Sequence, residues 1–130
     1  MYQPYADAAY YRDVYGGDTI PEEDIEKCLR TASRHIDSLT YNRIIGRGME
    51  TLSAFQRDII QEVCCEMADF EYENADMIQS VLQNYSINGV TMGFGSSWNL
   101  RTFSGVAVRA DTYEKLSQTG LCQLALRGRW

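Results

Sequence analysis

The sequence is poor in the residues on which several kinds of site depend. It has one histidine, His35, only two prolines, and four cysteines without a CxxC motif. A zinc site needs several Cys or His ligands at close spacing, so we expect no metal site. No apolar run approaches the roughly 20 residues of a membrane-spanning helix, and the first residues, MYQPYADAAYYRD, are polar. We therefore expect a soluble protein of a cytosol-like compartment, without a signal peptide, whose cysteines are reduced.

The length of the chain and its charge restrict the possible architectures and partners. One hundred and thirty residues suit a single domain, 1–130. The net charge of −6 is uneven, because residues 1–80 hold 7 Lys/Arg and 16 Asp/Glu, whereas residues 81–130 hold 5 and 2. An acidic body argues against general nucleic-acid binding. The basic C-terminal part fits an acidic surface or the acidic helix of a neighbouring copy.

Residues 53–80 form the predicted central helix. Ser53 suits the N-cap position, and neither Gly nor Pro interrupts the segment. Apolar residues recur at steps of three and four, which places them on one helix face. They are Phe55, Ile59, Val63, Met67, Ala68 or Phe70, Ala75 and Ile78. The sequence thus predicts a mainly α protein, a small helical bundle built on this long helix.

Three further helices are predicted at residues 6–15, 21–41 and 109–118, with a loop at 42–52 and an extended tail at 121–130. The 21–41 helix has its own apolar stripe and is expected to pack antiparallel to the central helix. The tyrosines of the first helix are interpreted either as a half-buried lid or as a binding surface. His35 lies beside the apolar stripe and is interpreted as a residue at the boundary between the core and the surface.

Residues 84–94 form a predicted short β-hairpin. Asn88-Gly89 favours a type I′ turn, and apolar residues alternate on both sides of it. Two strands alone are marginally stable, so the hairpin lies on the helices or pairs with another chain. Residues 95–108 are rich in Gly and Ser and are interpreted as a loop. We expect the segment 84–108 to become ordered only on assembly.

Five segments together carry a resemblance to a known family. They are a Tyr-rich opening that ends in YGG, IPEEDIEKCLRTASRHIDSLTYNRI, FQRDIIQEVCCEMADFEYEN, YSINGVTMGF and LSQTGL. In this order they resemble the head–tail connector (adaptor) proteins of tailed bacteriophages, especially phages of Gram-positive bacteria. The resemblance covers nearly the whole chain. Its specificity lies in the combination, because no single segment is a catalytic fingerprint.

The resemblance implies a structural virion protein that is not an enzyme and has no cofactor. Such proteins form a ring of identical subunits, commonly twelve, beneath the portal protein. The ring extends the DNA channel, through which DNA passes without specific binding, and offers a docking face to a stopper or tail-completion protein. The expected location is the portal vertex between capsid and tail, after assembly in the host cytoplasm, with no membrane contact.

Two sets of site residues follow. The resemblance implies that the hairpin and the tail contact the portal or a neighbouring subunit, and the aromatic residues between them are added to this set. These residues are Tyr85, Ile87, Asn88, Gly89, Val90, Met92, Trp98, Phe103, Leu121, Arg127, Arg129 and Trp130. The acidic face of the central helix is interpreted either as a channel wall that repels DNA phosphates or as an ordinary solvated face. Its residues are Glu62, Glu66, Asp69, Glu73 and Asp76.

Two other functions compete with the connector. A cysteine enzyme would use Cys64 or Cys65 with His35, but both thiols lie in mid-helix beside Glu62 and Glu66, where a lowered thiol pKa is disfavoured. A cytosolic helical module for protein–protein interaction explains the amphipathic helices equally well. It does not explain the hairpin, the aromatic loop and the Arg-Trp tail together.

Overall fold

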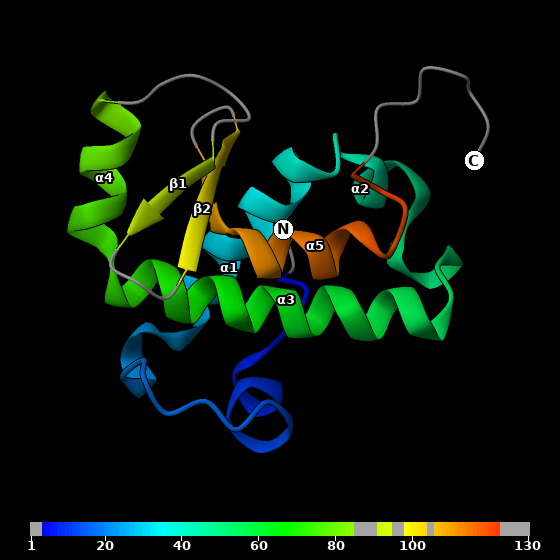
Figure 1. Ribbon diagram of the computed structural model, residues 1–130. Helices are drawn as coiled ribbons and strands as arrows, with labels where there is room; N and C mark the ends of the chain where they lie inside the picture. The colour runs from blue at the N-terminus through cyan, green and yellow to red at the C-terminus, as the bar shows by residue number, and fades with distance from the viewer. Residues whose placement is uncertain (1–3, 85–90, 95–97, 104–105, 123–130) are drawn as a thin grey trace, which may run out of the picture.

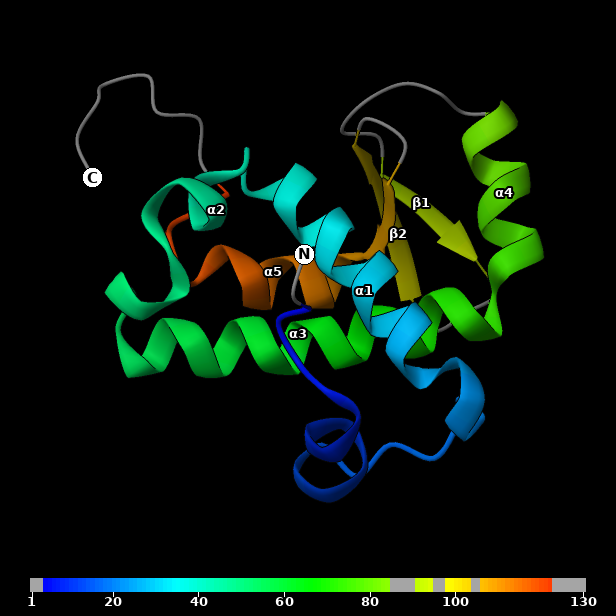
Figure 2. The same cartoon turned by 180° about the vertical axis from the view of Figure 1, so that it is seen from behind.

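A computed structural model of the chain describes residues 4–84, 91–94, 98–103 and 106–122, and between residues 80 and 105 it describes the backbone alone (Figures 1 and 2). The described part is mainly helical. Its elements are η1 (Tyr10–Val14), α1 (Glu22–Leu39), α2 (Arg43–Arg47), η2 (Met49–Thr51), α3 (Ala54–Glu73), α4 (Ala75–Asn84), β1 (Thr91–Phe94), β2 (Trp98–Phe103), β3 (Val106–Arg109) and α5 (Ala110–Ser117). None of the described helices combines the length and the apolar character that a bilayer crossing demands.

The long helix α3 begins as the sequence predicts. Ser53 is its N-cap, and the Ser53 hydroxyl and the Gln56 side chain form a reciprocal capping box. Most of the predicted stripe is buried, but the prediction is wrong for two of its residues: Phe55 is 58% exposed, and Ala75 is exposed as well. Gln56 donates a hydrogen bond to the carbonyl of Thr119, and Phe55, about 100° away on the helix, therefore faces outward. Cys64 and Cys65 are fully buried.

The predicted single helix over 53–80 is two helices. Asn74 separates α3 from α4 and has non-helical backbone angles. Its side-chain amide donates a hydrogen bond to the carbonyl of Phe70 at 3.0 Å. An Asn side chain that competes in this way for a backbone carbonyl weakens the helix at its own position. The chain consequently turns, and α4 leaves the axis of α3 (Figure 1).

The core lies between α1, α3 and α5. Helix α1 buries Ile25, Leu29 and Ile36 against α3, as its stripe predicts. Both views show α1 crossing α3 obliquely (Figures 1 and 2). Helix α5 packs on α3 as well, which explains why α3 is buried over a broader face than its stripe suggests.

The N-terminal segment, residues 4–20, folds across α1 and α3. Residues 8–14 are helical, which agrees with most of the predicted helix at 6–15, but from Tyr10 to Val14 the helix is a π-helix, η1. Tyr11 is fully buried, and Gly17 lies so close to its ring that a Cβ at Gly17 would be 2.4 Å from Tyr11 Cζ. Of the two interpretations of the tyrosines, the half-buried lid agrees with this packing.

The predicted loop at 42–52 contains α2 and η2. Tyr41 and Asn42 precede α2 with φ of 56° and 59°, and in the described part of the chain they are the only non-glycine residues with positive φ. Ile44 is buried beneath α2, whereas Ile45 is exposed. The short helix therefore closes over the end of the core and leaves part of its apolar surface in solvent.

Three strands form an antiparallel sheet in the order β1-β2-β3. Met92 is opposite Leu100 in the first pair, and Phe103 is opposite Val106 in the second. The predicted hairpin at 84–94 is not confirmed, because its turn at Asn88-Gly89 lies outside the described residues and Asn84 ends α4. The interpretation of 95–108 as a loop is wrong for β2 and β3.

The end of the described chain joins the core. Strand β3 buries Val106 and Val108 and leads directly into α5, which agrees with the predicted helix at 109–118. Gly120 has φ of 79°, and the chain then buries Leu121. The first two residues of the predicted tail, Leu121 and Cys122, are thus buried, and residues 123–130 lie outside the described part. The expectation that all of 84–108 is unordered before assembly disagrees with the burial of β3.

Candidate functional site

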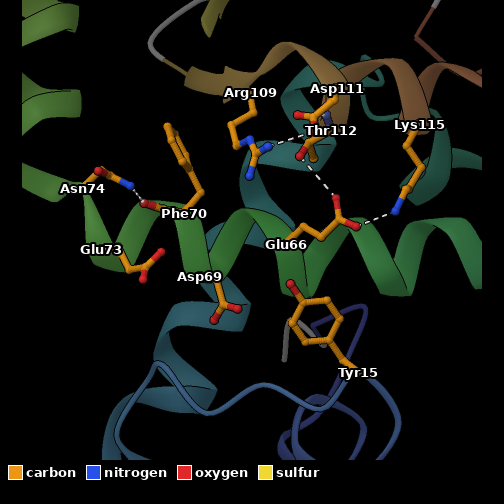
Figure 3. Close-up of a pocket in the computed structure, with 10 residues that line it drawn as sticks. All are labelled: Tyr15, Glu66, Asp69, Phe70, Glu73, Asn74, Arg109, Asp111, Thr112 and Lys115. Carbon is orange, nitrogen blue, oxygen red and sulfur yellow. Dashed lines mark hydrogen bonds and ion pairs between the residues drawn. The ribbon is translucent and has the colours of Figure 1, made fainter. Parts of the chain in front are cut away.

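A concave surface lies between the C-terminal half of α3 and the start of α5 (Figure 3). We call it the α3–α5 groove, and its volume is about 430 Å³. Tyr15 of the N-terminal segment closes one side. The lining residues are Tyr15, Glu66, Asp69, Phe70, Glu73, Asn74, Arg109, Asp111, Thr112 and Lys115.

Helical spacing brings the groove residues together. Glu66, Asp69 and Glu73 follow one another at steps of three and four, so they share one face of α3. Asp111 and Lys115, four residues apart on α5, face them. The direct packing of α5 on α3 sets the separation of the two helices.

Glu66 links the two helices. Its Oε1 accepts a hydrogen bond from the Thr112 hydroxyl at 3.2 Å, and its Oε2 pairs with Lys115. Lys115 also reaches Glu62 Oε1 at 3.2 Å. Burial lowers the pKa of Lys115, but the two carboxylates outweigh that effect and raise the pKa overall. This ammonium group neutralises much of the carboxylate charge at that end of the groove.

Asp69 joins the N-terminal segment to α3. Its Oδ1 accepts a hydrogen bond from the Tyr11 hydroxyl at 2.5 Å. Burial raises the pKa of Asp69, against the lowering effect of the hydrogen bonds from Tyr11 and Tyr15. Burial and the neighbouring carboxylate raise the pKa of Tyr11 to about 12, and that of Tyr15 is raised too. Both phenols are therefore neutral donors at physiological pH.

Arg109 borders the opposite side of the groove. Its Nη2 pairs with Asp111 Oδ2 at 2.9 Å, while Asp111 Oδ1 accepts the backbone N–H of Thr112. The Nε of Arg109 is buried and has no hydrogen-bond partner among the described residues. Glu73, also in the groove, forms no ion pair in that part of the chain and is exposed. Glu73 is thus a carboxylate that a ligand or a partner can reach.

A second hollow, of about 350 Å³, continues from the groove past the α3–α4 junction. Glu73 and Asn74 line both hollows, and Tyr72 and Asp76 line the second. The Tyr72 side chain is 40% exposed. The combined surface offers carboxylates beside an exposed aromatic ring, a chemistry that suits the guanidinium or ammonium groups of a protein partner.

The thiols and the histidine lie elsewhere. Burial raises the pKa of Cys64 to about 11 and also raises that of Cys65, which is the opposite of an activated nucleophile. His35 Nδ1 lies 2.6 Å from Glu71 Oε2 and links α1 to α3. Burial alone would lower the pKa of His35, but the Glu71 carboxylate outweighs it and raises the pKa. These contacts agree with the interpretation of His35 as a boundary residue.

The five predicted acidic residues do not form one free face. Glu62 and Glu66 pair with Lys115, and Asp69 binds Tyr11. Glu73 and Asp76 are exposed without ion pairs in the described residues. Sequence reasoning placed all five on one helix surface but missed Tyr11 and the α5 residues that pair with three of them.

The predicted contact residues are only partly described. Tyr85, Ile87, Asn88, Gly89, Val90, Arg127, Arg129 and Trp130 lie outside the described residues. Met92 lies in β1, and Trp98 and Phe103 begin and end β2. Leu121 is wrong as a surface contact, because its side chain is only 2% exposed and belongs to the core.

The described residues contain no group of three or more His, Cys, Asp or Glu side chains arranged to hold a metal ion. The absence of a metal and of a cofactor remains a prediction for the chain as a whole. Sequence reasoning missed the groove because its two walls are more than 30 residues apart. The one available signal was the placement of Arg109 and Lys115 on a short helix beside an acidic body.

The chain matches no protein-family model, no curated protein sequence and no solved structure.

Proposed function

We propose that the chain is a subunit of a bacteriophage head–tail connector. In this role identical copies form a ring between the portal protein and a stopper or tail-completion protein, and the ring extends the DNA channel. The protein is then a virion component at the portal vertex, assembled in the host cytoplasm. It performs no chemistry and needs no cofactor.

The support comes from the positions of the resembling segments in the fold. IPEEDIEKCLRTASRHIDSLTYNRI covers α1 and enters α2, and FQRDIIQEVCCEMADFEYEN is nearly all of α3. LSQTGL is the end of α5 with its glycine stop. The three segments thus coincide with the helices that build the core. A resemblance that follows the core helices is harder to explain by chance than one confined to loops.

Fewer acidic residues fit the role of a channel wall than the five that the sequence suggested. A channel wall that repels phosphates needs carboxylates without cationic partners. Asp76, next to the α3–α4 junction, meets this condition in the described residues, whereas Glu62 and Glu66 share Lys115. The proposed DNA-facing residue is therefore Asp76.

Disruption of the gene in its phage tests the proposal. We expect DNA-filled heads that carry a portal but no tail, and restored tailed particles when the wild-type chain is supplied from a plasmid. Normally tailed, infectious particles in the absence of the gene would refute a connector role. In that case the exposed apolar residues of α2 and α3 favour the cytosolic interaction module, for which a one-to-one complex with a host protein is the expected finding.

A further inference from the structure

The two ends of α3 carry surfaces of opposite character. We call residues 41–57 the α2 corner; they comprise the turn before α2, α2 itself, η2 and the start of α3. Both views place α2 and the start of α3 at the same end of the molecule, away from α4 (Figures 1 and 2). The α3–α5 groove occupies the other half of α3. The same molecule can therefore present the two surfaces to different neighbours.

The α2 corner has an unusual concentration of exposed apolar side chains. Tyr41, Ile45 and Phe55 are 51%, 54% and 58% exposed, and they are three of the five large apolar side chains that the described residues expose. Exposure of apolar side chains of this size to water is unfavourable, and their burial at an interface is favourable. The corner thus has the composition of a contact surface.

The backbone holds this surface in place. Tyr41 and Asn42 adopt the left-handed conformation, which costs free energy for non-glycine residues and persists only where the surrounding structure enforces it. The guanidinium of Arg43 lies 5.2 Å from the centre of the Tyr41 ring, and Arg43 Nη1 donates a hydrogen bond to the carbonyl of Leu121 at 2.9 Å. The Tyr41 ring is therefore fixed at the surface by a contact that reaches the far end of the chain.

The charges of the two surfaces are complementary. The α2 corner contains Arg43, Arg47 and Arg57 against one acidic residue, Glu50. Arg47 is exposed and forms no ion pair with another described residue. The groove has four carboxylates against two cations, and Glu73 at its open end is likewise exposed and unpaired in the described part. Each surface thus has a free charge of the sign that the other lacks.

We propose that the α2 corner of one copy docks on the α3–α5 groove of a second copy. Arg47 faces Glu73 in this contact, and the apolar side chains of the corner cover Tyr72 beside the groove. The contact is heterologous, because two different surfaces meet, and such contacts close into rings or continue as filaments. The inference rests on the proposed function for its setting, since it names the subunit contact within the connector ring.

Charge exchange tests the contact on the full-length chain. Sedimentation velocity at low ionic strength should show self-association of the wild type that weakens as salt is added. Arg47→Glu and Glu73→Arg should each raise the dissociation constant about fivefold or more, because each replaces an attraction by a repulsion. A mixture of the two variants should associate better than either alone, since the reversed residues now attract each other.

Arg30→Glu is the matched control. Arg30 is an exposed arginine of α1 outside the corner, and its substitution changes the net charge as Arg47→Glu does. It should leave the dissociation constant within twofold of the wild-type value, apart from the general effect of net charge. Unchanged helical circular dichroism and thermal midpoints verify that all variants fold.

Three results would overturn the contact: a wild type that stays monomeric at every concentration, single variants that associate like the wild type, or a mixture no better than its components. The connector proposal is tested by different results. A chain that binds portal rings while Arg47→Glu leaves its ring intact contradicts the contact alone. A chain that associates through this contact but never binds a portal contradicts the connector alone.

Discussion

The hydroxyl of Tyr11 donates a hydrogen bond to Asp69 across 58 residues of chain. The same oxygen accepts the backbone N–H groups of Thr19 and Ile20, both at 3.2 Å. One buried side chain thus holds the N-terminal segment together and attaches it to α3. Because buried polar groups that lose their partners cost free energy, this residue should be sensitive to substitution.

Tyr11→Phe removes that oxygen and keeps the ring. We expect a loss of about 2 kcal/mol in the free energy of unfolding, since two backbone donors lose their partner and Asp69 loses one of its two hydrogen bonds from tyrosines. Urea unfolding followed by circular dichroism measures it. Tyr10→Phe is the control, because the Tyr10 hydroxyl has no hydrogen bond within the described residues, and it should cost less than about 0.5 kcal/mol. Equal effects of the two substitutions would contradict this account.

Gly17→Ala tests the close approach of the N-terminal segment to the same ring. The added Cβ would lie 2.4 Å from Tyr11 Cζ, and the fully buried ring has no room to move. We expect destabilisation of about 2 kcal/mol by overpacking. Gly46→Ala, where a Cβ meets nothing within 4 Å, should be neutral or stabilise by up to about 1 kcal/mol. Thermal unfolding of the two variants compares them directly, and a harmless Gly17→Ala would show that the segment packs differently.

The His35–Glu71 pair predicts a specific pH dependence. The carboxylate raises the pKa of His35 above its ordinary 6.5 in the folded state. The pair therefore contributes its full stability below pH 6.5, where His35 is protonated in both states, and loses it as the pH rises through the folded-state pKa. Unfolding free energies from pH 5 to pH 9 and NMR titration of this single histidine measure the effect.

Glu71→Gln is the control for that titration. It removes the charge and leaves the burial of His35, so the pKa should fall and the loss of stability above pH 6.5 should disappear. A His35 pKa at or below 6.5 in the wild type, or one that Glu71→Gln leaves unchanged, would show that the pair does not operate in solution.

Thiol labelling examines the cysteine-enzyme alternative. Burial raises the pKa values of Cys64 and Cys122 to about 11, and both side chains are buried. Cys28 is partly exposed. A disulfide reagent at neutral pH should therefore modify Cys28 first and the remaining three thiols only when the protein unfolds. Rapid labelling of Cys64 or Cys65 in the native chain, identified by mass spectrometry, would revive that alternative.

Deletion of residues 123–130 separates the C-terminal charges from the core. It removes Arg127, Arg129 and Trp130 but keeps Leu121 and Cys122, which the core buries. We expect an unchanged helical spectrum and a chain that no longer enters particles. A deletion from residue 121 should in addition lose stability, because it removes Leu121. Normal incorporation of the shorter chain would show that these residues make no essential contact.

The core helices could be predicted from the sequence because periodicity and capping are local. The stripe of α1, the Ser53 cap and the glycine stop after α5 are all confirmed. The break at Asn74 was missed because one asparagine changes neither the periodicity nor the composition of the segment. Phe55 fits the stripe, but its burial depends on what packs on the first turn of α3.

The sheet and the groove could not be predicted because both depend on tertiary contacts between segments that are distant in the sequence. Strands β2 and β3 lie in a Gly/Ser-rich segment whose composition favours a loop, and only pairing and the burial of Val106 and Val108 make them strands. The groove depends on Lys115 meeting Glu66 and on Tyr11 meeting Asp69. No spacing in the sequence predicts which of five similar carboxylates finds a partner.

Electron microscopy of the portal vertex is the most direct test of the connector role. The purified chain is added to portal rings, or to DNA-filled tailless heads, encoded by the same phage genome. The account predicts an additional ring of density beneath the portal, with a rotational symmetry that fixes the number of copies. An unchanged vertex, with a portal that still binds its other partners, would contradict the central claim.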